Sequence, residues 1–453
     1  MRGSGIYVLV FVMGLFTTHA SFAQSKAEQM EKVVTAYAAN NQFMGSILVA
    51  QGDDIILNKG YGLANVEWNI PNSPTTKLRL ASVTKQFTAA SILLLEEQGK
   101  LKITDSVVKY FPNAPDAWRK ITIFNLLSHS SGIPDFTSFP EFSTFELLPT
   151  TPLKTIQTFQ DKALDFPPGE KVSYSSSGYI VLGALIEKVS GKSYEAFVQD
   201  NIFTPLKMNN SGYDSNAKII PQRAAGYIPS VDGVTNASYS DMSVPFSAGA
   251  LYSTTEDVLK WETALFGKKL LSSASLKKMI TPYKEGYALG LFVSNSNENT
   301  IIQHSGGIEG FNTQLTYYTD KKITVVVLAN INSYAINEIA NTLGDIAHGK
   351  KVEEVKSHKE ITLSVDVLKK YLGAYELEPS IDMLITLEGN HLMSRISNQK
   401  IETVPLFAET YTRFFTKIFD AQIDFVEDEQ HVVTHLVLHQ NGSDKKALRR
   451  KGL

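Results

Sequence analysis

The segment Arg79-Leu80-Ala81-Ser82-Val83-Thr84-Lys85-Gln86-Phe87 places a serine three residues ahead of a lysine, at the start of an apolar stretch with helical periodicity. Residues three apart on a helix share a face, so the Lys85 amine can reach the Ser82 hydroxyl. A serine hydroxyl is a weak nucleophile until a neighbour takes its proton, and a partly desolvated lysine can do so. The segment therefore predicts a serine nucleophile that is activated by a lysine.

The same spacing occurs elsewhere in the chain, so the spacing alone carries little weight. The other matches are Ser106/Lys109, Ser215/Lys218, Ser275/Lys278, Ser397/Lys400 and Ser443/Lys446. Around Ser82 the pattern opens a well-defined helix, because apolar residues recur from Val83 to Leu94 and Gly99 supplies a stop signal. We therefore expect Ser82 at a helix N-terminus, where free N–H groups and the helix dipole favour negative charge on its oxygen.

The composition is that of an ordinary globular protein. The chain has 453 residues, of which 43% are hydrophobic and 20% are charged, and its formal net charge is −3. This length is enough for two or three domains with a large core. The small net charge and the lack of a basic tract argue against nucleic acid as a partner.

Residues 1–23 have the pattern of a cleavable export signal. Arg2 provides a short positive region, residues 6–16 are apolar, and the small residues Ser21 and Ala23 predict cleavage before Gln24. A retained membrane anchor is the alternative, but the apolar stretch is short for a membrane span. The chain has no cysteine, which excludes disulfides and a lipid-anchoring cysteine. We therefore expect a periplasmic or secreted protein, with no stable membrane anchor after cleavage.

Residues 24–350 have the pattern of an α+β domain. A helix is expected over residues 27–40, a β-hairpin over 45–57, a helix over 179–189 and a second hairpin over 313–328. We expect the two hairpins to join in one antiparallel sheet flanked by helices, with a helical subdomain from the middle of the chain.

The character of the chain changes near residue 350. Residues 351–362 begin with a charged run and are expected to be a linker. Residues 363–453 contain short alternating segments that are separated by turns such as Glu388-Gly389-Asn390. This pattern predicts a small all-β barrel domain.

Two further segments could complete a site around Ser82. Tyr174 lies in a polar loop ahead of an apolar helix, and its phenol could relay a proton if a cation such as Lys85 lies nearby. His304 precedes the glycines at 306–307, whose backbone can approach a ligand closely and donate an N–H to an oxyanion. Taken alone, Tyr174 could equally be a packing aromatic and His304 a structural histidine.

In their order and spacing, these segments resemble the serine β-lactamase and penicillin-binding-protein superfamily. The resemblance is greatest to the branch of class C β-lactamases, D-stereospecific peptidases and related esterases. Residues 80–85 match the S-x-x-K motif, 174–176 (Tyr-Ser-Ser) stand in place of Y-x-N, and 304–306 (His-Ser-Gly) in place of K-T-G, as an H-x-G variant. Residues 126–133 and 247–254 are supporting matches, and the region from residue 368 onward is similar to the lipocalin-like β domain appended to some of these enzymes.

The resemblance implies that Ser82 forms an acyl-enzyme and that Lys85 and Tyr174 shuttle the proton. It implies an oxyanion hole made by the backbone N–H groups of Ser82 and Gly307, and it makes His129 a structural residue. The other substrate-binding positions that it implies are Ser176, His304, Ser305 and Gly306. It implies no cofactor, and the scattered histidines lack the spacing of metal ligands.

Two positions depart from the family pattern. Ser176 replaces the usual asparagine, and a hydroxyl cannot reproduce the paired hydrogen bonds of an amide. His304 replaces the lysine of K-T-G, which removes a permanent positive charge that would hold a substrate carboxylate. Both changes reduce the expectation of efficient penicillin hydrolysis, while acyl transfer by Ser82 is unaffected.

The sequence therefore favours a serine hydrolase that acts on peptides with D-amino acids or on related amides. The expected substrate is a small molecule or a peptide derived from peptidoglycan. Weak β-lactamase activity is a further expectation. A carboxylesterase acting on small esters is the first alternative. A non-catalytic binding or scaffold protein is the second, and Ser176 is its only support. The oligomeric state is left open.

Overall fold

The computed structural model describes residues 25–230, 233–295, 299–352, 358–397, 403–417, 421–440 and 443–450. The predicted export signal lies outside the described residues, as do residues 353–357 of the predicted linker. Within the described ranges, no helix has both the length and the apolar character that a membrane crossing requires.

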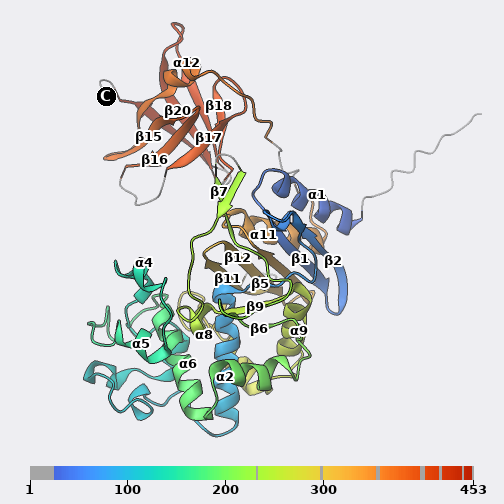
Figure 1. The fold of residues 1–453 in the computed structure, drawn as a ribbon, viewed down its shortest axis with the longest axis vertical. Coiled ribbons are helices and arrows are strands. Elements are labelled where there is room, and N and C mark those ends of the chain that lie inside the picture. Colours follow the sequence, from blue (N-terminus) through green and yellow to red (C-terminus); the bar gives the residue numbers. More distant parts are fainter. Residues whose placement is uncertain are drawn as a thin grey trace, which may run out of the picture.

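A six-stranded antiparallel sheet is built from both ends of the larger part of the molecule (Figure 1). Strands β1 and β13 pair directly, with Gly45 opposite Ala329 and Gln51 opposite Ile323. The two predicted hairpins therefore share one sheet, as expected. In spatial order the strands are β10 (Phe292–Asn295), β11 (Thr300–Ile308), β12 (Phe311–Tyr318), β13 (Ile323–Ala329), β1 (Gly45–Gln51) and β2 (Asp54–Tyr61).

Strands β13 and β1, which are neighbours in the sheet, face a hydrophobic core on each side. Ile47 and Val49 of β1 lie in the core beneath α1 (Lys26–Ala39) and α11 (Ala335–His348), whereas Leu48 lies in the opposite core. Successive side chains of a strand point to opposite faces, so a strand that is covered on both faces must be apolar throughout. Residues 47–50 of β1 and 325–329 of β13 meet this condition.

Helices cover the second face and extend into a helical subdomain, as expected. Helix α9 contacts β1 and β13, and α2 packs against α6 and α8. The left-handed Gly191 (φ 71°) ends α6, close to the predicted end at residue 189. These helices are α2 (Thr84–Glu97), α3 (Ile123–Leu127), α4 (Phe142–Phe145), α5 (Pro152–Gln157), α6 (Ser176–Ser190), α7 (Tyr194–Val198), α8 (Phe246–Gly249), α9 (Thr255–Phe266) and α10 (Ser273–Ile280).

Short strands join the sheet to the helical subdomain. One small sheet has the order β5-β9-β6, and it carries the chain into the segment that contains Ser82. Two further strand pairs, β3 with β4 and β7 with β8, lie beside the main sheet. The short strands are β3 (Leu63–Asn65), β4 (Ile70–Pro71), β5 (Leu78–Arg79), β6 (Gly212–Tyr213), β7 (Tyr227–Ser230), β8 (Gly233–Asn236) and β9 (Leu251–Ser253).

The C-terminal part is a closed antiparallel barrel that follows the short helix α12 (Val365–Leu368). The barrel has its own hydrophobic core, which includes Tyr371, Tyr375 and Phe425. A closed all-β barrel confirms the predicted fold class of this region. Its strands are β14 (Gly373–Glu378), β15 (Ile381–Glu388), β16 (His391–Ile396), β17 (Val404–Ala408), β18 (Arg413–Phe415), β19 (Ala421–Glu427), β20 (Val433–Gln440) and β21 (Ser443–Arg449).

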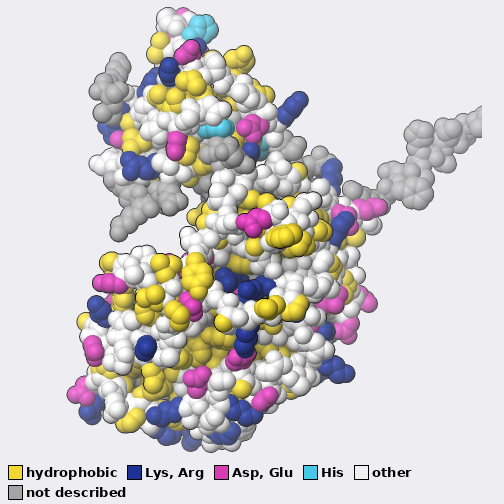
Figure 2. Space-filling view, in the orientation of Figure 1, with side chains coloured by type: hydrophobic (Ala, Val, Ile, Leu, Met, Phe, Trp, Pro, Cys, Tyr) yellow, Lys and Arg dark blue, Asp and Glu magenta, His cyan; other side chains and the backbone are white. Residues whose placement is uncertain are grey.

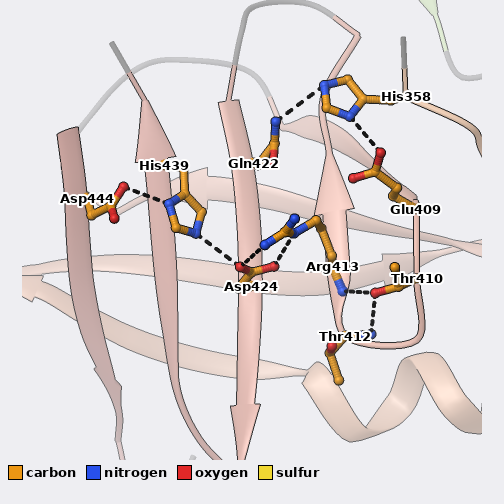
Figure 3. Close-up of polar contacts among 9 residues, drawn as sticks. All are labelled: His358, Glu409, Thr410, Thr412, Arg413, Gln422, Asp424, His439 and Asp444. Atoms are coloured by element: carbon orange, nitrogen blue, oxygen red, sulfur yellow. Dashed lines mark hydrogen bonds and ion pairs between the residues drawn. The ribbon is translucent and has the colours of Figure 1, made fainter. Parts of the chain in front are cut away.

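A chain of polar side chains crosses four neighbouring strands of the barrel (Figure 3). Arg413 on β18 donates two hydrogen bonds of 2.6 Å to the carboxylate of Asp424 on β19. His439 on β20 contacts Asp424 at 3.1 Å through Nε2 and Asp444 on β21 at 2.7 Å through Nδ1. Side-chain pairs between adjacent strands stabilise a sheet, so this chain of contacts ties β18 to β21.

Candidate active site

Ser82 lies on a 3₁₀ turn, Ala81–Val83, that leads directly into α2. The α-helix itself starts at Thr84, two residues after the expected start at Ser82, and it follows a left-handed backbone at Ala81 (φ 46°). Strand β11 approaches this turn closely. A Cβ atom at Gly306 would lie 2.5 Å from the carbonyl oxygen of Leu80, so only glycine fits there.

Lys85 is fully buried beside the serine. Its Nζ lies 3.1 Å from Ser82 Oγ and donates to the carbonyl oxygen of Ala248 at 2.9 Å. The same nitrogen lies 4.9 Å from the ring centre of Tyr174 and 5.6 Å from that of Tyr179. A buried cation needs such partners, and together they hold the amine next to the hydroxyl.

The lysines of other S-x-x-K matches have a different environment. Lys109, Lys218 and Lys278 are about half exposed, and each pairs with a carboxylate. An exposed, ion-paired ammonium is an ordinary surface group. Burial against neutral partners therefore distinguishes Lys85 from these matches.

Tyr174 is held over Lys85 by a histidine. The ring of His129 stacks on that of Tyr174, with the centres 4.4 Å apart. The backbone N–H of Ser175 donates to His129 Nδ1 at 3.0 Å, so the ring proton is on Nε2. Burial, and then the charge of Lys85, lower the pKa of His129 well below its ordinary value of 6.5. His129 is thus a neutral support for the tyrosine, in keeping with the structural role that the resemblance implied.

His304 is also buried and neutral. Its Nδ1 lies 2.6 Å from the carbonyl oxygen of Ser305, which can only accept, so Nδ1 carries the proton. Its Nε2 lies 3.2 Å from the hydroxyl of Tyr287, which therefore donates to it. Burial, and then the charge of Lys85, lower the pKa of His304 to about 4. The position that holds a cation in the K-T-G pattern is therefore uncharged near neutral pH.

Ser82 opens into two adjoining cavities. The first, which we name the histidine cavity, has a volume of about 550 Å³ and is lined by His304, Tyr287 and Gln303. The second, the lysine cavity, has a volume of about 300 Å³ and is lined by Lys85, Asp135 and Glu309. Both cavities are lined by Ser82, Tyr174 and Gly307. A substrate can therefore extend to both sides of the serine.

The remaining predicted positions lie around the same two cavities. Ser176 lines the lysine cavity at the start of α6, and its backbone N–H donates to Asp135 at 3.3 Å. Ser305 lines the histidine cavity. Gly306 is buried beneath them and packs against the turn of Ser82. The structure thus places all of the predicted positions in one region.

Sequence reasoning missed two side chains at this site. Tyr287 and Tyr179 contact His304 and Lys85, and they lie in stretches without a recognisable motif. Ala248, whose carbonyl holds Lys85, lies inside the segment 247–254 that supported the family resemblance, so a sequence signal for it was present.

Two glutamates face each other at the edge of the lysine cavity. Burial, and then the charge and hydrogen bond of Glu309, raise the pKa of Glu146 to about 7. Glu146 is therefore partly protonated near neutral pH. Among the residues that the structure describes, no cluster of three or more metal-binding side chains is found.

Comparison with known proteins relates the chain to one family over most of its length. The sequence model of the family described as Beta-lactamase matches residues 30–347. Penicillin-binding protein 4* of Bacillus subtilis is 28% identical over 455 residues, which cover 94% of this chain and 100% of that protein.

Solved structures show the same similarity. The octameric penicillin-binding protein homologue from Pyrococcus abyssi aligns with a TM-score of 0.65 and 27% identity, covering 93% of this chain and 99% of the other. A D-stereospecific amidohydrolase from Streptomyces sp. aligns with a TM-score of 0.56 and 25% identity, covering 66% of this chain and 94% of the other.

Proposed function

Since the chain belongs to the beta-lactamase family, we propose that it is a serine hydrolase that forms an acyl-enzyme at Ser82, on peptides or related amides that contain D-amino acids. One observation carries the proposal: a fully buried Lys85 amine lies 3.1 Å from a serine hydroxyl that opens into two cavities. The similarity to a penicillin-binding protein and a D-stereospecific amidohydrolase supports the substrate class.

In the first step, the neutral amine form of Lys85 takes the proton of Ser82 while the serine oxygen attacks the substrate carbonyl carbon. The backbone N–H groups of Ser82 and Gly307 stabilise the negative charge that develops on the carbonyl oxygen. The bond to the leaving amine then breaks, and the amine receives the proton through Tyr174. Water attacks the resulting ester at Ser82, the acid leaves, and the serine regains its proton.

The proposal is tested by labelling the purified full-length protein with a fluorescent penicillin and with a fluorophosphonate. Mass spectrometry then locates the modified residue. We expect the label on Ser82, and none in Ser82→Ala. Ser215→Ala is the matched control, because Ser215 has the same spacing to a lysine, Lys218, that is exposed and paired with Glu195. Label on another residue, or label that survives Ser82→Ala, contradicts the proposal, and a complete lack of Ser82-dependent turnover favours a non-catalytic binder.

A carboxylesterase is the second candidate function. It is favoured by the neutral His304, because the histidine cavity then offers no cation to a substrate carboxylate. Comparing kcat/KM for D-alanyl peptides, nitrocefin and short nitrophenyl esters separates the candidates. Turnover of the esters without turnover of the peptides supports the esterase.

We also propose that the protein is exported to the periplasm or secreted, where peptidoglycan-derived peptides are available. The proposal rests on the pattern of residues 1–23. N-terminal sequencing of the protein after expression in a bacterial host tests it. We expect a mature chain that begins at Gln24, and an intact Met1 contradicts the proposal.

A further inference from the structure

A third cavity continues the lysine cavity away from Ser82. This arginine cavity has a volume of about 270 Å³ and is lined by Arg79, Arg223, Tyr239 and Phe311. It shares Ser240 and Glu309 with the lysine cavity, so the two adjoin. A substrate chain that leaves Ser82 through the lysine cavity therefore reaches the two arginines.

The two arginines share a single buried carboxylate. Arg79 Nε lies 2.7 Å from Asp214 Oδ2, and Arg223 Nη1 lies 2.6 Å from Asp214 Oδ1, with the Asp214 side chain fully buried. Arg223 Nη1 also donates to the carbonyl oxygen of Ser215. A guanidinium has five N–H donors, so these contacts leave donors of both arginines for the cavity. Asp214 can neutralise only one of the two positive charges.

The arginines are held in place and reinforced by neighbouring groups. The guanidinium of Arg79 lies 5.1 Å from the ring centre of Phe311. Lys77 precedes Arg79 by two residues on an extended segment, so the two share a face, and its backbone pairs with Arg223. Figure 2 shows Lys and Arg side chains gathered in a hollow of this face, in the region of β5 and β9. The cavity therefore presents positive charge on a preorganised wall.

Glu309 is a carboxylate side chain that opposes the positive charge of the arginine cavity. It lines both cavities and faces Glu146, and burial together with Glu309 raises the pKa of Glu146 to about 7. Glu146 is therefore partly protonated near neutral pH. Asp214 accepts hydrogen bonds from both arginines, so two guanidinium groups of the cavity wall share one buried carboxylate.

We propose that the arginine cavity binds an anionic group, a carboxylate or a phosphate, of the substrate whose carbonyl reacts at Ser82. Guanidinium groups match the planar geometry of these anions and form charge-assisted hydrogen bonds with them. The inference rests on the proposed function and deepens it, because it names a charged feature of the substrate. It also gives the substrate an ionic contact at a place other than the neutral His304.

The experiment uses nitrophenyl half-esters of dicarboxylic acids of increasing chain length, each compared with the same ester capped as its methyl ester. A second series carries the carboxylate on the leaving group. We expect wild type to prefer the free carboxylate at one chain length by roughly 10-fold or more in kcat/KM. Arg223→Gln removes this preference, and Arg223→Lys restores part of it. Arg119→Gln, a change of an exposed arginine that pairs with Asp116, leaves the preference intact.

The ratio of the kcat/KM values for charged and capped esters shows whether Arg223 binds the substrate anion or has only a structural role. If Arg223→Gln lowers both kcat/KM values equally, Arg223 only braces Asp214 and the proposal is wrong. Equal hydrolysis of charged and capped esters by wild type, in both series, also overturns it.

A binding measurement decides the question even if no ester is hydrolysed, and the labelling of Ser82 tests the proposed function separately. Adipate and inorganic phosphate are added separately at constant ionic strength, and thermal unfolding is followed. We expect at least one of them to raise the Tm of wild type and of Arg119→Gln but not of Arg223→Gln, and the effective anion identifies the group. No rise with either anion overturns the proposal.

Discussion

At the scale of single residues, the site depends on keeping one amine buried beside one hydroxyl. Lys85 is fully buried, and its partners are the Ala248 carbonyl, the Ser82 hydroxyl and two phenol rings. None of these partners is a carboxylate, so no ion pair among the described residues draws the amine away from Ser82. The position therefore requires an amine that can exchange a proton, and not merely a positive charge.

Lys85→Ala and Lys85→Arg are both expected to lower the rate of Ser82 acylation by about 10²–10⁴-fold. Alanine removes the base, and arginine keeps the charge but does not release its proton in proteins. The rate of labelling by the fluorophosphonate measures the effect, and circular dichroism checks the fold. Lys278→Arg is the control, because Lys278 pairs with Glu96 on the surface. A Lys85→Arg variant with wild-type labelling would show that charge alone is needed.

His304→Lys is expected to change which substrates are preferred, while Ser82 remains the nucleophile. A lysine there restores a cation to the histidine cavity, and a charge-assisted hydrogen bond to a substrate carboxylate contributes about 1.5–3 kcal/mol. Peptides that end in a free carboxylate should gain about 10–100-fold in kcat/KM relative to the same peptides with a C-terminal amide. An unchanged ratio between these peptides, with Ser82 still labelled, contradicts the role given to this position.

The residues of the site differ in how far sequence could locate them. Ser82, Tyr174 and His304 stand in local motifs with a recognisable chemistry, and the structure places them around one pair of cavities. The contacts of Tyr287 and Tyr179 arise only when distant segments fold together. Their pattern in the chain is that of ordinary packing aromatics, so no local signal could have singled them out.

At the scale of elements, hydrophobic pattern predicted the sheet better than it predicted the start of α2. The hairpins over 45–57 and 313–328 have apolar strands and polar turns, and both are present in one sheet. The tight turn at Ala81 is set by the approach of β11, where Gly306 meets the carbonyl of Leu80. This constraint comes from a contact between distant segments of the chain, so the periodicity of the helix sequence could not predict it.

Helix α9 contains a buried acid that makes stability depend on pH. Burial raises the pKa of Glu262 from its ordinary 4.5 to about 8, and Oε2 has no hydrogen-bond partner among the described residues. Between these pH values the native state keeps a proton that the unfolded state has released. The free energy of unfolding therefore falls as pH rises from 4.5 to about 8.

Glu262→Gln should remove this fall in the free energy of unfolding with rising pH, because glutamine has no proton to release. The stability of the variant relative to wild type should increase with pH across that window, by roughly 1.4 kcal/mol per pH unit. Urea denaturation at several pH values measures it. Glu256→Gln on the same helix is the control, because Glu256 is exposed and accepts a hydrogen bond from Asn58. Parallel stability curves for wild type and Glu262→Gln would contradict the assignment.

At the scale of the whole molecule, the barrel has a core of its own. The hydrophobic cluster that includes Tyr371, Tyr375 and Phe425 is separate from the two clusters that flank the main sheet. The regular alternation of apolar and polar residues predicted the strands of the barrel from sequence. Closure of the barrel depends on the pairing of its first and last strands, β14 and β21, and alternation within single strands does not predict this pairing. Separate cores predict separate unfolding transitions, with residues 351–362 as the proposed linker between them.

Asp424→Asn is expected to destabilise the barrel and leave the Ser82 site intact. The change removes the charge that accepts two hydrogen bonds from Arg413 and contacts His439 (Figure 3), at a cost of about 1–2 kcal/mol. For a unit of this size, 1 kcal/mol lowers Tm by roughly 4–8 °C. Calorimetry should show one transition moving down, while the other transition and the rate of Ser82 labelling stay unchanged. Asp366→Asn, at an exposed ion pair with Lys369 on α12, should move neither transition. A single transition that shifts as a whole would mean that the barrel and the Ser82-containing part unfold as one unit.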